Sequence, residues 1–416
     1  MLTETQKIDA LIQLSSELSR IKDLDILMEH ILTEARRFVN ADAGSIYIRD
    51  GDRLGFGYTQ NDTLEQELTS GSKLIYSTFT IPIDQESIAG YCAATGEILN
   101  ITDVFHMDAS LPYSFNRTFD ERSGYKTKSM LALPLKTLQG DVIGVLQIIN
   151  AQDAEKKVIP FSGKDKHMMD HFAATATVAL ERARLTRNII LRTIRMTQMR
   201  DPQETGAHAN RVASFASEIY ERWAQRREMA PSQIAIDRDV FRMAAMLHDA
   251  GKVAISDTLL KKPGRLTPNE YEQMKTHTLA GSRIFTDRNS EFDRAAFDIA
   301  LNHHERWDGL GYPGHIDVLT GKPLDGRVDA EGKPLGKKEE EIPLFGRIVA
   351  IADIYDALTA KRIYKEAWDE AKALQVIEEG SGRQFDPELT DIFFSCLDAI
   401  RQIQGRYPEL KRVWEE

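Results

Sequence analysis

Residues 302–314 of the chain, NHHERWDGLGYPG, combine two adjacent histidines with a glutamate, an aspartate and three glycines. The apolar run FDIAL at 297–301 leads into them and has the spacing of a buried helix face. Packing alone gives no reason to gather so many polar side chains at a helix end, and glycines allow a backbone to approach a ligand closely. We therefore expect His303 and His304 to belong to a functional site.

Further histidines and acidic residues lie beside other apolar helical patterns. They are Glu204 and His208 in ETGAH, His248 and Asp249 in LHDAGK, His277 in MKTHTLAGS and Asp353 in IADIYDALTAKR. Taken singly, each has a structural explanation: a lone helical histidine is usually structural, an HD dipeptide occurs by chance, and paired histidines can cap a helix. Together they predict a divalent metal site, because imidazole combined with carboxylate suits borderline metals.

These motifs also carry a resemblance to a known family. The segments HDAGK, HHERWDGLGYP and IADIYDALTAKRIYK resemble the HD-GYP subgroup of the HD-domain phosphohydrolases, over residues 204–386. The resemblance implies hydrolysis of cyclic di-GMP at a centre of two or three iron or manganese ions. It assigns as metal ligands Glu204, His208, His248, Asp249, His277, His303, His304 and Asp353. Two-metal members lack a carboxylate at the position of Glu204, so its presence favours three metals.

The chemistry of such a centre suggests further roles. Asp249 is suited to bridging two metals, which would activate a water for in-line attack on phosphorus without a covalent nucleophile. We expect His248, Asp249, Lys252 and Asp356 to be catalytic, with Lys252 pairing a phosphate oxygen and Asp356 orienting either the water or a ligand histidine. The expected substrate-binding residues are Lys252, Asp308, Gly311, Tyr312, Arg362 and Lys365.

The first half of the chain has a different pattern. Two amphipathic helices are expected at 11–39, followed by short β-rich runs such as SIYIRD, TFTIPI, EILNI, SMLALPL and VIGVLQIIN. The segment ESIAGYCAATG predicts a short helix that ends at Gly96. Helices around an antiparallel sheet make this half an α+β domain.

The motifs SIAGYCAATGEILNITDVF, FDERSGYKTKSMLALPLK and VIGVLQIIN resemble a GAF domain of the kind found in cyclic-nucleotide phosphodiesterases and adenylate cyclases, over residues 11–185. The resemblance implies a nucleotide site, with cyclic AMP or cyclic GMP as the ligand. The matching positions are Ser45, Ile88, Ala89, Asp120, Ser123, Thr127 and Gln147. The chain keeps Asn150, Phe161 and Asp165 of a signature common in these domains but has Ala151 and Lys166 in place of its lysine and glutamate. The alternatives for this domain are that it binds another small ligand, or that it dimerises and binds no ligand.

A long helix is expected to connect the two halves. Residues 165–200 contain no proline or glycine, and Leu185, Ile189, Met196 and Met199 form a thin apolar stripe. Such a stripe favours a parallel dimer over docking on the chain's own domains. His167 and His171 lie one turn apart on this helix, and a solvated face explains them better than a metal site.

The predicted organisation is therefore α+β with three parts: a GAF sensor domain at 1–165, a signalling and dimerisation helix at 166–200, and an all-α HD-GYP bundle at 201–416. The net charge of −11 excludes a general nucleic acid polymer binder, so cations for a phosphate must be local. No apolar run approaches the roughly 20 residues of a membrane span. Cys92 and Cys396 are expected to be buried free thiols, which fits a cytoplasmic protein.

The leading functional hypothesis is a GAF-regulated phosphodiesterase that opens cyclic di-GMP to linear pGpG and, further, to GMP. One alternative is a phosphodiesterase for another cyclic dinucleotide such as cyclic GMP-AMP. It is motivated by residues 314–341, a glycine-rich, charged segment expected to be a long surface loop that covers the site. A catalytically weak cyclic-di-GMP receptor is the other alternative, and the intact ligand set speaks against it.

Overall fold

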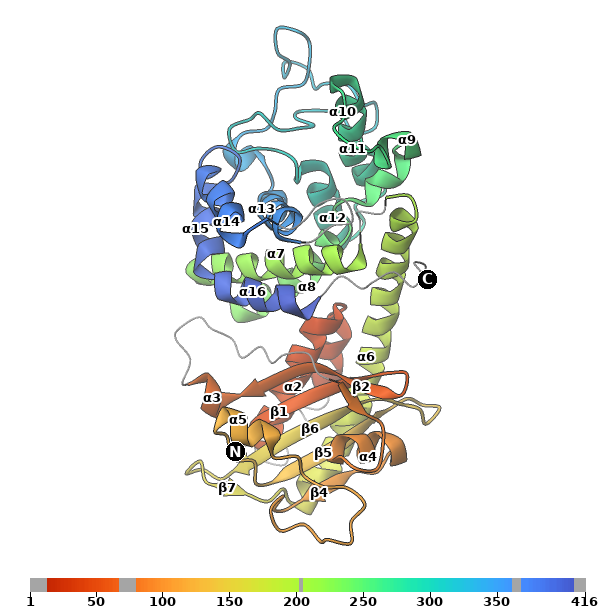
Figure 1. The fold of residues 1–416 in the computed structure, drawn as a ribbon, viewed down its shortest axis with the longest axis vertical. Coiled ribbons are helices and arrows are strands. Elements are labelled where there is room, and N and C mark those ends of the chain that lie inside the picture. Colours follow the sequence, from red (N-terminus) through yellow and green to blue (C-terminus); the bar gives the residue numbers. More distant parts are fainter. Residues whose placement is uncertain (1–12, 67–79, 202–204, 361–367, 408–416) are drawn as a thin grey trace. The chain divides into compact units, whose positions relative to one another are not determined.

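The computed structural model describes residues 13–66, 80–201, 205–360 and 368–407. The chain forms two compact units, residues 1–186 and 187–416. Figure 1 shows a sheet with helices in the first unit and helices throughout the second. None of the described helices combines the length and the apolar character needed to cross a membrane. The predicted α+β class, with a long helix leading into a helical domain, is confirmed.

The first unit is built on a seven-stranded antiparallel sheet with the order β3-β2-β1-β6-β5-β4, and β7 pairs with β6. The strands are β1 (Ala41–Asp50), β2 (Arg53–Asn61), β3 (Thr80–Pro82), β4 (Leu99–Ile101), β5 (Met130–Lys136), β6 (Val142–Gln152) and β7 (Val158–Ile159). Its helices are α2 (Leu24–Val39), α3 (Asp62–Glu65), α4 (Ile88–Thr95), α5 (Thr118–Ser123) and the long α6 (Gly163–Gln198).

The two faces of this sheet bury different cores. Ile46, Leu146 and Ile148 pack with α2 and the first turns of α6, while Tyr47 and Val145, one residue out of phase, pack with α4. This alternation follows from the period of two in a strand. The short helix at α4 ends at Gly96 as expected, in a left-handed conformation with φ of 70°. Strand β2 was missed because its glycines, Gly55 and Gly57, obscure the β pattern.

Helix α6 presents two kinds of surface along its length. Ala176, Leu180 and Ala183 are buried in the first unit, and Ile190 and Ile194 are buried in the second. The stripe expected from the sequence is exposed, with exposed fractions of 65% for Leu185, 63% for Ile189, 65% for Met196 and 82% for Met199. The long helix is therefore confirmed, and its stripe is not covered by the described residues of this chain. His167 and His171 are exposed, as expected.

The described part of the second unit contains helices and turns but no named strand. Its α-helices are α7 (Gly206–Arg226), α8 (Pro231–Ala245), α9 (Asp257–Leu260), α10 (Pro268–Lys275), α11 (His277–Arg283), α12 (Glu291–Asn302), α13 (Leu344–Thr359), α14 (Glu370–Glu379), α15 (Pro387–Ser395) and α16 (Leu397–Arg406). Two 3₁₀ helices, η1 (Ala250–Ala254) and η2 (Glu339–Glu341), complete it. Phe215, Phe241, Ile299, Tyr355 and Phe393 are among the residues of its core.

The glycine-rich segment after the GYP turn is a surface loop with its own internal order. It contains the tetrapeptide GKPL twice, at 321–324 and 332–335. Each copy closes a tight turn, through the bridges Ile316–Pro323 and Val328–Pro334. The two turns are joined where the backbone N–H of His315 donates to the carbonyl of Leu335 at 2.8 Å. Hereafter we call residues 314–341 the insert.

Candidate metal centre

Five helical elements of the second unit deliver the expected ligands to one place. His208 lies in the first turn of α7, after Thr205 caps the helix. His248 and Asp249 lie between α8 and η1, His277 begins α11, His303 and His304 follow α12, and Asp353 lies in α13. Glu204, the expected ligand of a third metal, lies outside the described residues. Seven of the eight predicted ligands can therefore be placed.

The seven side chains form two groups, each with ligand atoms within 4.8 Å of one another: Asp249 with His277, His303 and His304, and His208 with His248 and Asp353. Asp249 Oδ1 lies 3.2 Å from His277 Nε2 and 3.6 Å from His303 Nε2. Its other oxygen, Oδ2, lies 3.4 Å from His248 Nε2 in the second group. Asp249 therefore reaches both groups, as a carboxylate that bridges two cations must.

The imidazole rings are held by hydrogen bonds on the nitrogen that faces away from the cluster. Nδ1 of His248 lies 2.9 Å from the Ala245 carbonyl, and Nδ1 of His303 lies 3.0 Å from that of Ile299. His277 uses the Met274 carbonyl in the same way, at 2.7 Å. A carbonyl can only accept, so each Nδ1 carries the proton and each Nε2 presents a lone pair to the cluster.

Several of these inward atoms are buried without a hydrogen-bond partner in the described chain. They are Asp249 Oδ1, His277 Nε2 and His303 Nε2. Buried polar atoms are nearly always hydrogen-bonded, because desolvation of an unpaired one is costly. Three converging lone-pair donors without a protein partner fit a divalent cation, and imidazole with carboxylate fits a borderline metal. The residues present therefore suit the implied metals.

The charge state of these groups also suits metal binding. Burial lowers the pKa of His303, and burial together with the neighbouring His303 and His277 lowers that of His304 far below its usual value. Burial alone would raise the pKa of Asp249, but Lys252 and His248 outweigh it and hold the pKa well below the usual range. Neutral imidazoles and an ionised carboxylate are the forms that bind metals.

Lys252 contacts the centre directly. Its Nζ lies 2.7 Å from Asp249 Oδ2 and 3.5 Å from Asp201 Oδ2, and it lines the adjacent cavity. Gly251 permits this placement, because a Cβ there would collide with the backbone of His277 and Gly281. Close packing of η1 on α11 therefore brings Lys252 to the same cluster as His277.

Asp356 lies behind His208 and does not line the cavity. Its carboxylate accepts a hydrogen bond from His208 Nδ1 at 2.7 Å and two from Arg211 at 2.5 and 2.9 Å. Burial alone would raise the pKa of Asp356, yet the bonds from His208 and Arg211 bring it down to about 2. Of the two roles expected for Asp356, the geometry corresponds to orienting a ligand histidine.

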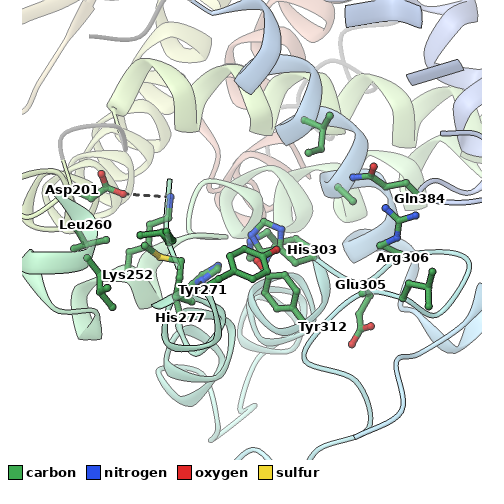
Figure 2. Close-up of a pocket in the computed structure, with 18 of the residues that line it drawn as sticks. Asp201, Lys252, Leu260, Tyr271, His277, His303, Glu305, Arg306, Tyr312 and Gln384 are labelled. Carbon is green, nitrogen blue, oxygen red and sulfur yellow. Dashed lines mark hydrogen bonds and ion pairs between the residues drawn. The ribbon is translucent and has the colours of Figure 1, made fainter. Parts of the chain in front are cut away.

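A cavity of about 530 Å³ opens beside the cluster. Figure 2 shows Lys252 and Arg306 on opposite sides of it, with His303 and Tyr312 between them. Tyr312 stacks on His304 with ring centroids 4.9 Å apart, and Tyr271 of α10 meets Tyr312 edge-on at 6.2 Å. The cavity therefore offers separated cations and aromatic faces beside the expected metal ligands.

The remaining residues expected to bind substrate differ in whether they line the cavity. Gly311 lines the cavity, and a Cβ there would collide with the backbone of Glu305 and Arg306, so the turn requires glycine. Asp308 instead stabilises the turn: it pairs with Arg306 at 2.6 and 3.0 Å and accepts the N–H of Leu310. Two expected cations, Arg362 and Lys365, lie outside the described residues.

Sequence reasoning missed several residues that line the cavity. These are Asp201, Lys262, Tyr271, Arg306 and Gln384. Asp201 follows the connecting helix and lies next to Lys252, which only the fold could show. Lys262 is held by Glu270 at 2.5 Å. Tyr271, in the segment TPNEYEQMK, and the nearby Lys262 were the residues from which the sequence could have predicted this side of the cavity.

The expected ligand residues of the first unit gather on the α4 face of the sheet. Ser45 of β1 pairs in register with Gln147 of β6, and both are buried. Ile88 and Ala89 begin α4, which packs on the same face. Thr127 is buried and donates to Asp120 through its backbone N–H at 2.7 Å and its hydroxyl at 2.9 Å.

The remaining member of that set, Ser123, ends α5. Its hydroxyl is exposed and donates to the carbonyl of Phe119 at 2.8 Å. Asp165, part of the incomplete signature, accepts from the Ser162 hydroxyl at 2.7 Å at the start of α6. Asp165 therefore contributes to a helix terminus in this chain.

Comparisons with known proteins agree with both units. The HD domain model matches residues 205–358 and the GAF domain model matches residues 23–180. A cyclic di-GMP phosphodiesterase of Thermotoga maritima is 38% identical over 211 residues, covering 51% of this chain and 49% of that protein. A cyclic di-GMP phosphodiesterase of Vibrio cholerae is 34% identical over 247 residues, covering 58% and 45%. The 3'3'-cGAMP-specific phosphodiesterase 2 of the same organism is 35% identical over 207 residues, covering 50% and 34%.

Among solved structures, the GAF domain of A. aeolicus nlh2 is similar, with 17% identity and a TM-score of 0.32 over 42% of this chain and 95% of that one. By the family-model matches, residues 23–180 are a GAF domain and residues 205–358 are an HD domain, which holds a cluster suited to divalent metals. The chain spans half or less of the length of the curated relatives it matches.

Proposed function

We propose that this chain is an HD-GYP-type phosphodiesterase that hydrolyses cyclic di-GMP to linear pGpG, with further hydrolysis to GMP to be decided by product analysis. The observation that carries the proposal is the convergence of Asp249, His277 and His303 on one point, with buried lone pairs that no described group satisfies. The relatives named as cyclic di-GMP phosphodiesterases support the same substrate.

The metal ligands, Lys252 and Asp356 have separate roles in the proposed reaction. Two or three iron or manganese ions, held by the seven described ligands and Glu204, would activate water and take up charge on the phosphoryl oxygens. Lys252, fixed between Asp249 and Asp201, places an ammonium where a non-bridging phosphate oxygen would bind. Asp356 keeps the proton of His208 on Nδ1, so that its Nε2 faces the cluster.

The cavity has features that match a cyclic dinucleotide. Lys252 and Arg306 lie on opposite sides, so that two phosphates can each meet a cation despite the negative charge of the chain. Tyr271, 47% exposed, and Tyr312 present aromatic faces on which guanine bases can stack. The expected clamp of the second phosphate by Arg362 and Lys365 remains part of this proposal.

The deciding experiment is turnover of cyclic di-GMP by anaerobically purified full-length protein, with metal analysis on the same sample. Turnover should require iron or manganese, and the paired substitutions His248→Ala and Asp249→Ala should abolish it. Absence of turnover by protein loaded with either metal would reject the enzyme proposal in favour of a receptor. Retained turnover in the paired variant would reject the site.

A second substrate, 3'3'-cyclic GMP-AMP, is favoured by one relative and by the insert that follows the GYP turn. Leu310, which is 78% exposed, lines the cavity close to where the insert begins. Competition between the two cyclic dinucleotides in one reaction would give the ratio of their kcat/KM values. A ratio in favour of cyclic GMP-AMP would replace cyclic di-GMP in the proposal.

We further propose that the GAF domain regulates this activity by binding cyclic AMP or cyclic GMP on its α4 face. Support comes from the buried polar residues gathered there, among them Ser45, Thr127 and Gln147. Thermal shift of the full chain with each nucleotide tests it: a shift with one, absent with 5′-AMP and 5′-GMP, is expected. No shift with either cyclic nucleotide would reject nucleotide sensing.

The proposed assembly is a cytoplasmic homodimer formed through α6 and the GAF domain. The exposed stripe supports it, because Leu185, Ile189, Met196 and Met199 repeat at coiled-coil spacing. Light scattering of the native chain should give twice the monomer mass, and Ile189→Glu with Met196→Glu should give the monomer. A native monomer at micromolar concentration would contradict this assembly.

A further inference from the structure

The insert is attached to the metal centre at both of its ends by one buried carboxylate, that of Glu305. The backbone N–H of Gly314, at the start of the insert, donates to Glu305 Oε1 at 2.5 Å. The backbone N–H of Lys337, near its end, donates to Glu305 Oε2 at 3.2 Å. In Figure 2 this carboxylate points away from His303. Glu305 therefore closes the base of the insert and does not face the expected metals.

The side chain of Lys337 makes a second attachment. Its ammonium donates to Oδ1 of Asn302, which is 1% exposed and whose amide donates in turn to the Asp298 carbonyl at 2.7 Å. The Lys337 side chain is partly buried, and this burial lowers its pKa. Burying an ammonium requires hydrogen-bond acceptors to offset its desolvation. Lys337 thus contributes to the local structure, whereas Lys333 of the same insert is exposed.

These two attachments lie immediately before and after the histidine pair. Asn302 precedes His303, and Glu305 follows His304. His303 is also oriented by the carbonyl of Ile299. Within the described residues, the ring nitrogens of His304 make no hydrogen bond, and its ring is held by stacking on Tyr312. The orientation of the His304 ring therefore depends on the backbone between Asn302 and Glu305.

We propose that Lys337 is a positioning residue of the metal centre. By holding Asn302 and, through its own backbone, Glu305, it fixes the short segment that aims His304 at the cluster. The insert then holds one metal ligand in position. This role differs from the expected one, which was to cover the cavity. This inference rests on the proposed function only in requiring that a metal binds at the cluster.

The test uses metal alone on the full-length protein, so it does not depend on the substrate. Lys337→Met removes the ammonium but keeps the apolar stem, and Lys333→Met makes the same change at an exposed lysine of the same insert. Mn²⁺ titration of the metal-free proteins should show binding weakened about 10- to 100-fold in Lys337→Met, as for other residues that orient metal ligands. Lys333→Met should match the native protein, and Lys337→Arg should lose less affinity than Lys337→Met.

A spectroscopic readout separates positioning from simple destabilisation. The visible absorption of bound Co²⁺ reports ligand geometry, so it should change in Lys337→Met and stay native in Lys333→Met. Equal Mn²⁺ affinity and identical Co²⁺ spectra in Lys337→Met and native protein would overturn the inference. If Lys337→Met does not fold by circular dichroism, Glu305→Gln takes its place with the same expected outcomes, because an amide can accept only one of the two backbone hydrogen bonds that Glu305 accepts.

The two proposals can fail separately. Mn²⁺ binding that depends on Lys337, in a protein that does not turn over cyclic di-GMP, would keep this inference and reject the proposed function. A native protein that binds neither Mn²⁺ nor Fe²⁺ at the cluster would reject both.

Discussion

The two expected sites, one in each unit, differ in how their buried polar residues are hydrogen-bonded. In the HD domain, Asp249, His277 and His303 converge with lone pairs that no described group satisfies. In the GAF domain, two of the expected ligand residues are bonded to each other: Asp120 accepts twice from Thr127. The first arrangement is incomplete without a cation. For the Asp120–Thr127 pair, a nucleotide must exchange existing hydrogen bonds for its own and gains only the difference.

This contrast predicts a large effect of metal on one unit only. Mn²⁺ present at about a thousand times its dissociation constant should stabilise the HD domain by roughly 4 kcal/mol against unfolding. All four tryptophans of the chain, Trp223, Trp307, Trp368 and Trp414, belong to the second unit, so tryptophan fluorescence follows that unit alone. Unfolding midpoints with Mn²⁺ and with excess chelator supply the measurement. Identical midpoints would show that the converging lone pairs have another purpose.

The next largest effect is expected at Asp356. Asp356→Asn preserves volume but removes the charge that holds the proton on His208 Nδ1 and pairs with Arg211. Metal affinity or kcat should fall about 10- to 100-fold. Asp398→Asn, an exposed carboxylate on α16, is the matched control and should behave as native. A native-like Asp356→Asn would mean that the orientation of His208 does not depend on this carboxylate.

A smaller effect is expected at the aromatic wall of the cavity. Tyr271→Ala removes a stacking surface for a base, which is worth about 1–3 kcal/mol. Steady-state kinetics with cyclic di-GMP should therefore show KM raised about tenfold with kcat little changed. Tyr271→Phe keeps the ring and should retain native KM. A loss confined to kcat would place Tyr271 in the chemical step and not in binding.

The smallest effect is expected in the GAF domain, where Asp120 and Thr127 already pair with each other. Thr127→Val removes one of the two hydrogen bonds to the Asp120 carboxylate and should lower the free energy of unfolding of this unit by about 1 kcal/mol. Ser19→Ala, which removes an exposed hydroxyl of the same unit that donates to the Ser16 carbonyl, should change it by less than about 0.5 kcal/mol. Hydrogen exchange of peptides from β5 and β6, followed by mass spectrometry, can report the unfolding of this unit alone. Equal stability of both variants would show that the Asp120–Thr127 pair is dispensable.

The sequence alone could predict site residues where a motif lies at the end of a recognisable helical pattern. The HD and HH pairs end apolar helical runs, so the sequence alone groups their residues with the other expected ligands, and seven of that set lie in the cluster. The alternation of apolar residues likewise located the strands of the sheet except β2 and β7, where glycines or short length obscured the period.

What the sequence could not supply were contacts between residues distant along the chain. Asp201 reaches Lys252 from the end of the connecting helix, and Lys337 reaches Asn302 across the whole insert. Nothing in their local sequence distinguishes these residues from surface charges. Their partners become apparent only when burial and hydrogen bonds are known in three dimensions.

The way in which the histidine rings are anchored bears on how the centre tolerates mutation. His248, His277 and His303 are anchored by main-chain carbonyls three or four residues earlier, and every amino acid supplies a carbonyl. Side-chain replacements around those three ligands therefore leave their tautomers unchanged. His208 is different, because its anchor is the side chain of Asp356, which a single nucleotide change can remove. In a diverging lineage, we expect the His208 side of the centre to be the first to lose its metal.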